Sequence, residues 1–146
     1  MIEEGKYRGK KVSVLGAGVS GRALAELSVR LGAQVFVSDA KALKPEAAEE
    51  FKKLGVAWEE NGNTERLLDA DEIVVSSGIS PQNPMLVKAF EKGLKVTGEL
   101  DFVHPYLDGT IIAVTGSNGK TTTTSMIGSF LEQCGFAVMT GGNIGN

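Results

Sequence analysis

The sequence predicts an α/β fold: a parallel sheet with helices on both faces, followed by the first strand, helix and strand of a second unit. Short apolar runs alternate along the chain with segments whose apolar residues recur at helical spacing. Glycines follow the helical segments, as is common where a helix ends. The alternation is complete by residue 108 and begins again at residue 110, and 146 residues suffice to bury a sizeable core.

Five strands and three helices are expected in the first 108 residues. The run 11–15 (KVSVL) precedes a glycine and is typical of a buried parallel strand. An apolar stripe from Ala23 to Leu31 predicts the first helix, because the charged residues of this segment fall on another face. The same reasoning gives strands at 34–38, 56–58, 72–77 and 95–97, and helices along the apolar stripes of 47–54 and 85–90.

A second α/β unit is expected to begin after residue 108. The run 110–115 (TIIAVT) predicts a strand, and 136–140 (FAVMT) predicts another. A helix between them has one apolar stripe, formed by Met126, Ile127, Phe130, Leu131 and Cys134. We therefore expect domains at 1–108 and 109–146, with unpaired strand edges in the second that could pair with another copy of the chain.

Composition and charge exclude several classes of protein. The net charge of −3 argues against a general nucleic-acid-binding surface. No apolar run approaches the roughly 20 residues that span a bilayer, so no membrane association is expected. The sole cysteine, Cys134, cannot form an internal disulfide, and the charged N-terminus resembles no secretory leader, so we expect a cytoplasmic location. Residues 109–146 hold only two charges, Lys120 and Glu132, as expected for the central part of a larger sheet.

Gly16-x-Gly18-x-x-Gly21 lies between the first strand and the first helix. Glycines at this spacing let the backbone turn tightly and approach a diphosphate, whose charge meets the free N–H groups at the helix N-terminus. Asp39 ends the next strand, where a carboxylate can accept a hydrogen bond from a nucleotide. The combination predicts a Rossmann-like domain that binds a nucleotide diphosphate, without deciding which nucleotide.

A second glycine-rich loop, 116–121 (GSNGKT), also follows a predicted strand and opens a helix. Backbone N–H groups of such a P-loop surround phosphates, the lysine reaches the terminal phosphate oxygens, and the following hydroxyl is a ligand for Mg²⁺. The loop is shorter than the standard Walker pattern, because Val114 stands where that pattern has its first glycine. Thr121 and Thr122 can both offer hydroxyl and N–H groups to phosphate.

Five motifs together resemble the Mur ligases, and most closely the members that add D-glutamate. They are VSVLGAGVSG at 12–21, SSGISPQNP at 76–84, GELDF at 98–102, AVTGSNGKTTTT at 113–124 and GGNIG at 141–145. The match runs from about residue 11 to residue 146 in the family's order, and the shortened lysine loop is the family's own form.

The resemblance implies an ATP- and Mg²⁺-dependent ligase of peptidoglycan synthesis, and hence of cell-wall biogenesis and cell division. Its substrates would be UDP-N-acetylmuramoyl-L-alanine and D-glutamate, joined through an acyl phosphate. The family has three domains, so residues 1–108 would bind the UDP end of the substrate and 109–146 would open the central ATPase. The 146-residue chain is then expected to be a truncated piece that can bind the UDP moiety but cannot turn over.

Carried over position by position, the resemblance also implies site residues. Ala40 and Lys41 stand where the family often has Thr and Arg, which leaves the base contact open. Lys120 would be the catalytic residue on the β- and γ-phosphates, with Thr121 on Mg²⁺. The UDP moiety would be bound by Gly18, Val19, Ser20, Asp39, Lys41, Gly78 and Asn143, and ATP by Gly116, Ser117, Asn118, Gly119, Lys120, Thr121 and Thr122.

Three other interpretations stay open at this point. A relative that adds L-alanine to UDP-N-acetylmuramate is disfavoured by the glycine in Ser77-Gly78-Ile79-Ser80-Pro81. An NAD-binding dehydrogenase domain would use Asp39 on the ribose, but the Lys120 loop would then have no role. A non-catalytic UDP-sugar-binding module would need only the first unit.

Overall fold

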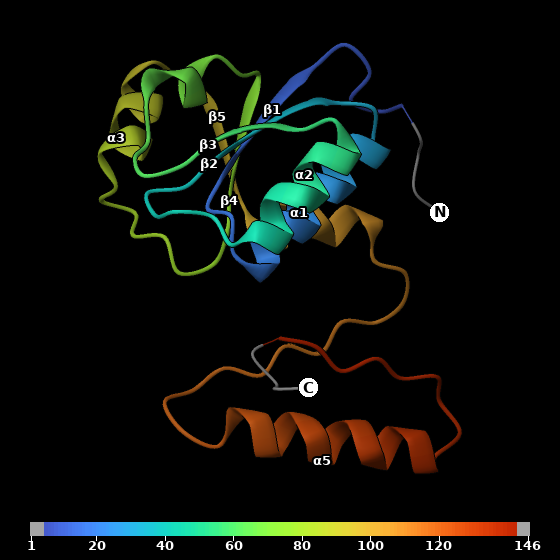
Figure 1. The fold of residues 1–146 in the computed structure, drawn as a ribbon. Coiled ribbons are helices and arrows are strands. Elements are labelled where there is room, and N and C mark those ends of the chain that lie inside the picture. Colours follow the sequence, from blue (N-terminus) through green and yellow to red (C-terminus); the bar gives the residue numbers. More distant parts are fainter. Residues whose placement is uncertain (1–4, 143–146) are drawn as a thin grey trace. The chain divides into compact units, whose positions relative to one another are not determined.

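The computed structural model describes residues 5–142, and the chain divides into two compact units, Met1–Asp108 and Gly109–Asn146 (Figure 1).

The first unit is built on a five-stranded sheet in which all neighbouring strands are parallel. The strand order is β3-β2-β1-β4-β5, which confirms the predicted α/β fold. The strands are β1 (Lys11–Leu15), β2 (Gln34–Ser38), β3 (Ala57–Glu59), β4 (Glu72–Val75) and β5 (Lys95–Gly98). The chain moves outward from β1 in one direction and then continues in the other from β4, so β1 and β4 flank a topological switch point.

The three predicted helices of this unit are present, and each is longer than the apolar stripe that predicted it. They are α1 (Val19–Arg30), α2 (Pro45–Leu54) and α3 (Pro84–Glu91). Three further elements were not predicted, because each is too short to show a helical stripe: η1 (Glu65–Leu68), α4 (Glu99–Val103) and η2 (His104–Tyr106).

Two apolar clusters lie on opposite faces of the sheet. Val12 and Val14 of β1 point to the face covered by α1 and α2, where they belong to one core with Phe51. Figure 1 shows these two helices side by side. Leu15 and Ile73 belong to the second cluster, which η1 and α3 cover. The division follows from the strand period of two, because successive side chains point to opposite faces.

The second unit contains α5 (Lys120–Gln133), as predicted, but the expected strands at 110–115 and 136–140 are wrong. In the part of this unit that the structure describes, no strand forms. A strand exists only where a neighbour supplies the hydrogen bonds of a ladder, and apolar composition alone cannot supply them.

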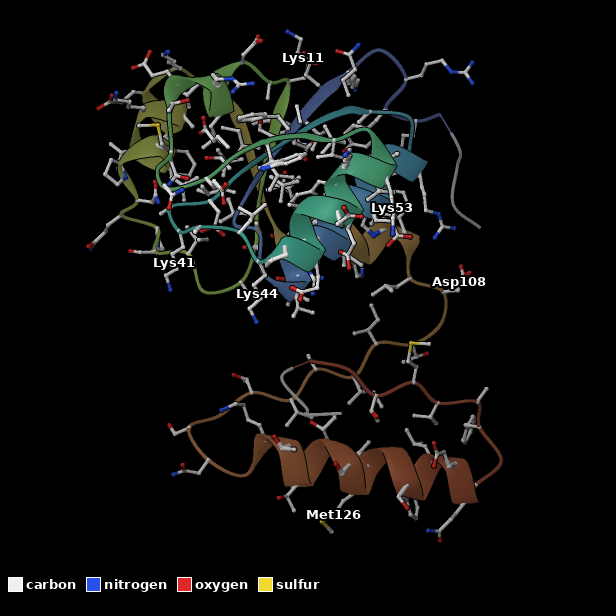
Figure 2. All side chains as sticks on the ribbon, in the orientation of Figure 1. Lys11, Lys41, Lys44, Lys53, Asp108 and Met126 are labelled. Carbon is white, nitrogen blue, oxygen red and sulfur yellow. The ribbon has the colours of Figure 1, made fainter. Side chains whose placement is uncertain are left out.

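The packing face of α5 also differs from the predicted stripe. Met126 and Phe130 are 68% and 66% exposed, and Cys134 is exposed as well. Gly128 is the buried residue of α5, and a Cβ built there would lie 2.6 Å from the Thr140 side chain. The helix therefore packs through its small residue, where the neighbouring segment approaches most closely. Figure 2 shows Met126 projecting outward from this helix.

Candidate nucleotide site

The carboxyl ends of β1 and β4 lie next to each other at one edge of the sheet, because Leu15 pairs with Val75. The glycine loop 16–21 begins at the end of β1, and the serine-rich loop 76–80 begins at the end of β4. Open parallel sheets bind ligands at this edge, at a switch point of this kind. Two loops that are about 60 residues apart in sequence thus flank one candidate site.

Two of the three glycines in the first loop are required by packing. Gly16 has a φ of +100°, and a Cβ there would overlap the hydroxyl of Ser76. At Gly21, a Cβ would overlap the carbonyl oxygen of Gly16. The first and third glycines therefore let the loop, the end of β4 and the start of α1 come together.

Gly18 has a different environment. It is the residue that caps α1, and no atom lies within 4 Å of the position that its Cβ would occupy. Val19 beside it is 79% exposed. The N–H groups of the first helical turn have no acceptor within the helix, so this open surface can accept an anion.

Asp39 contacts the glycine loop directly. Its carboxylate accepts the N–H of Ala17 at 2.7 Å through one oxygen and the N–H of Lys41 at 2.8 Å through the other. The acid therefore ties the loop after β1 to the loop after β2. Each carboxylate oxygen can accept a further hydrogen bond, so the geometry is compatible with the nucleotide contact expected from the sequence. That contact stays a prediction.

The loop after β4 is held on two sides. The buried Ser76 hydroxyl donates to the carbonyl of Leu15 at 3.0 Å, and the Ser77 N–H donates to Oε2 of Glu99 at 2.8 Å. The Ser77 and Ser20 hydroxyl oxygens lie 3.4 Å apart, which joins the two loops. Sequence reasoning missed the contacts of Ser76, Ser77 and Glu99, although the GELDF motif contained the signal of an acid directly after a strand.

Gly78 and Lys41 complete the predicted residues of this edge. Gly78 has a φ of +89° and open space around its missing Cβ. Lys41 is exposed after β2, and Figure 2 shows it at the opposite end of the first unit from Lys11, which starts β1. Asn143, the remaining predicted ligand of the UDP moiety, lies outside the described residues.

Hydrogen bonds among polar side chains connect the carboxyl ends of β2 and β3 at the same edge of the sheet. Glu59 accepts hydrogen bonds from the Ser38 hydroxyl and from both the N–H and the hydroxyl of Thr64. Burial alone would raise the pKa of Glu59, but these hydrogen bonds and the charge of Arg66 outweigh burial and lower it. Glu59 is therefore held as a carboxylate that anchors the loop beside Asp39.

The loop 116–119 of the second unit leads directly into α5. Gly116 and Gly119 have φ values of +150° and +75°, and Gly119 caps α5. The first helical N–H with an acceptor is that of Thr123, which bonds to the Gly119 carbonyl at 2.9 Å. The N–H groups of Lys120, Thr121 and Thr122 therefore point out of the helix start, and they fit a phosphate group.

Lys120 bonds within its own loop, since its ammonium group donates to the Gly116 carbonyl at 2.5 Å. Thr121 and Thr122 are exposed. Among residues 5–142, no group of three or more His, Cys, Asp or Glu side chains is placed to hold a metal ion. The role of Thr121 on Mg²⁺ stays a prediction.

Over the same residues, no helix is both long and apolar enough to cross a membrane.

Comparison with protein families gives two matches. The family model for the MurD N-terminal domain matches residues 11–85, and the model for the Mur ligase middle domain matches residues 114–146. The UDP-N-acetylmuramoylalanine–D-glutamate ligase of Christiangramia forsetii is 40% identical over 139 residues, and that of Bacteroides fragilis is 42% identical over 137. These alignments cover 94% and 93% of this chain, which spans only 31% of the length of either relative.

Solved structures show the same similarity. A murein peptide ligase from Psychrobacter arcticus is 30% identical with a TM-score of 0.62, and the alignment covers 87% of this chain and 27% of that one. The UDP-N-acetylmuramate–alanine ligase of Thermotoga maritima is 25% identical with a TM-score of 0.58, over 86% of this chain and 30% of its own.

Proposed function

The chain belongs to the Mur ligase family, and on that premise we propose that the whole protein adds D-glutamate to UDP-N-acetylmuramoyl-L-alanine. The chain spans 31% of its curated relatives, so the activity belongs to the whole protein. The substrate carboxylate would take the γ-phosphoryl group of ATP to give an acyl phosphate, and ADP would leave. The amine of D-glutamate would then attack the acyl carbon, and phosphate would leave.

The first unit would bind the UDP end of the substrate. The observation that carries this proposal is the open backbone at Gly18, which faces solvent at the switch point while Gly16 and Gly21 are closely packed. A diphosphate there would meet the N–H groups of Val19 and Ser20 at the start of α1. The uridine would lie toward Asp39, Lys41 and Gly78, which follow β2 and β4.

The second unit would contribute the phosphate loop for ATP. Residues 116–122 would surround the phosphates, Lys120 would leave the Gly116 carbonyl to reach the β- and γ-phosphate oxygens, and Thr121 would be a ligand of Mg²⁺. The bound metal would neutralise charge on the phosphates. We expect weak ATP binding by this chain, because the loop is exposed and Lys120 is already hydrogen-bonded.

We further propose that the 146-residue chain does not turn over by itself. Mg²⁺ binds mainly through carboxylates, and in the described part of the second unit Glu132 is the one acidic side chain, near the opposite end of α5 from Thr121. ATP-dependent release of phosphate by this chain, requiring both D-glutamate and the UDP substrate, would contradict this proposal. The cytoplasmic location and self-association of the second unit stay predictions.

Isothermal titration calorimetry tests the substrate. UDP-N-acetylmuramoyl-L-alanine should bind to the chain, and NAD should give no heat of binding. UDP alone should bind more weakly than the full substrate, because the sugar and peptide contacts are absent. Binding of NAD in place of the UDP ligands would favour a dehydrogenase-like domain, and a preference for UDP-N-acetylmuramate over its L-alanyl form would favour the L-alanine-adding relative.

A further inference from the structure

Glu99 lies beside the candidate nucleotide site without belonging to any predicted set of ligands. It is the first residue of α4 and follows β5 directly. Because Val75 pairs with Gly98 in neighbouring parallel strands, Glu99 and the loop after β4 leave the sheet at the same edge. Its half-buried side chain turns toward that loop, where Oε2 accepts the N–H of Ser77 at 2.8 Å.

The contact completes a clamp on the start of the loop. Ser76 is fixed to β1 through two hydrogen bonds to the Leu15 carbonyl, one from its N–H and one from its hydroxyl. Ser77 is fixed from the opposite side, by Glu99. Two consecutive residues are thus held from either side of β4, by Leu15 of β1 and by the first residue of α4, immediately before Gly78 with its φ of +89°.

The clamp extends to the glycine loop. The Ser77 hydroxyl lies 3.4 Å from the hydroxyl of Ser20, in the first turn of α1. The path from Glu99 through Ser77 to Ser20 therefore crosses the switch point between β4 and β1. A displaced Ser77 would change the distance between the two loops that flank the diphosphate.

We propose that Glu99 is a positioning residue for nucleotide binding, which fixes Ser77 and through it the spacing between the β1 and β4 loops. This role rests on the proposed function, because it assumes that the UDP end of the substrate binds at this edge. Glu99 itself touches no substrate in this proposal. Its carboxylate is suited to the role because a hydrogen bond to an ionised acceptor is shorter and stronger than one between neutral groups.

Two measurements on the 146-residue chain test the role. In ¹⁵N-labelled protein, Glu99→Ala should move the Ser77 amide proton upfield and speed its exchange with solvent, because the carboxylate acceptor is lost. In calorimetry, UDP-N-acetylmuramoyl-L-alanine should bind to the E99A chain about tenfold more weakly. Glu99→Gln keeps an acceptor oxygen and should restore affinity to within about threefold of the unmodified chain.

Asp101→Ala is the matched control, since it removes an exposed carboxylate from the same turn of α4. The D101A chain should keep both the Ser77 amide signal and the affinity. If E99A does not fold, Glu99→Asp replaces it, because the charge stays while the shorter side chain falls short of Ser77.

The outcomes separate the two proposals. Substrate binding that E99A leaves unchanged would overturn the positioning role alone, as would an equal loss in D101A. A complete lack of substrate binding by the unmodified chain would contradict the proposed function and remove the positioning role with it. Weaker binding in E99A, recovered in E99Q, would support both.

Discussion

Gly16 and Gly18 lie two residues apart but meet different physical demands. Gly16 adopts a φ of +100° against the Ser76 hydroxyl, so Gly16→Ala should lower the free energy of unfolding by roughly 2–4 kcal/mol. Gly18 has a φ of −67° that any residue adopts, and its Cβ position is open. Gly18→Ala should therefore change stability by less than about 1 kcal/mol.

The same pair distinguishes packing from binding. Gly18→Ala should weaken binding of the UDP substrate about tenfold or more, because a methyl group would stand where the diphosphate approaches the backbone. Urea unfolding gives the stability of both variants, and calorimetry gives the affinity of the folded one. If the G18A chain binds as tightly as the unmodified chain, the diphosphate does not lie on this loop.

Asp39 carries a second prediction at the residue scale. Asp39→Ala should weaken substrate binding about tenfold or more, because the N–H groups of Ala17 and Lys41 lose their acceptors and the glycine loop is released. Lys41→Ala is the comparison: it removes a side chain that is itself a predicted ligand of the UDP moiety but keeps the backbone N–H that Asp39 accepts, so it should weaken binding less than Asp39→Ala. A larger loss in K41A than in D39A would mean that the lysine side chain, and not the loop geometry, provides the affinity.

At the scale of elements, β4 begins at a buried carboxylate that ties three segments together. Glu72 is 4% exposed and accepts hydrogen bonds from Tyr7, Lys95 and Thr97. Burial alone would raise the pKa of Glu72, but the hydrogen bonds from Thr97, Lys95 and Tyr7 outweigh the effect of burial, and the pKa is lowered. Burial, followed by the hydrogen bond to Glu72, raises the pKa of Tyr7.

These shifts predict two pH windows of lost stability. With its folded pKa lowered, Glu72 stabilises the fold above the pKa of the unfolded chain, about 4.3, and the contribution is lost as pH falls through the folded value. With its folded pKa raised, Tyr7 contributes below about pH 10, and that contribution is lost as pH rises toward the folded value.

Urea unfolding from pH 3 to pH 11 measures both windows. Glu72→Gln should flatten the acidic decline, and Tyr7→Phe should flatten the alkaline one. An E72Q profile that falls as steeply below pH 4 as that of the unmodified chain would assign the acidic decline to other carboxylates.

The elements also show what the sequence could predict. Strands 11–15 and 34–38 were predicted to the residue, because each is a short apolar run bounded by polar or glycine residues. The same kind of apolar run predicted strands at 110–115 and 136–140, and those predictions are wrong. A strand needs a hydrogen-bonding neighbour, and that neighbour cannot be inferred from the residues of the strand itself. The hydrogen bond between Glu99 and Ser77 could not be predicted from the sequence for a related reason, because it depends on which strands become neighbours.

At the scale of the whole molecule, the two compact units predict a division of binding. A chain of residues 1–108 contains the complete sheet, both apolar clusters and both loops at the switch point. It should therefore still bind UDP, and the loss of Asn143 should weaken that binding by no more than about tenfold. Calorimetry with UDP on the two chains measures the ratio, and loss of UDP binding from the shorter chain would place an essential ligand after residue 108.

Asn143 is the one predicted ligand of the UDP moiety that follows residue 108. Family resemblance assigns this asparagine to the phosphate and sugar region of the substrate, so Asn143→Ala should weaken binding of both UDP-N-acetylmuramoyl-L-alanine and UDP, by up to about tenfold. Asn146→Ala, three residues further along, is the control and should change neither. Because UDP keeps the diphosphate and lacks the N-acetylmuramoyl sugar, a loss for the full substrate alone would place Asn143 on the sugar, and no loss for either ligand would contradict its assignment to the substrate.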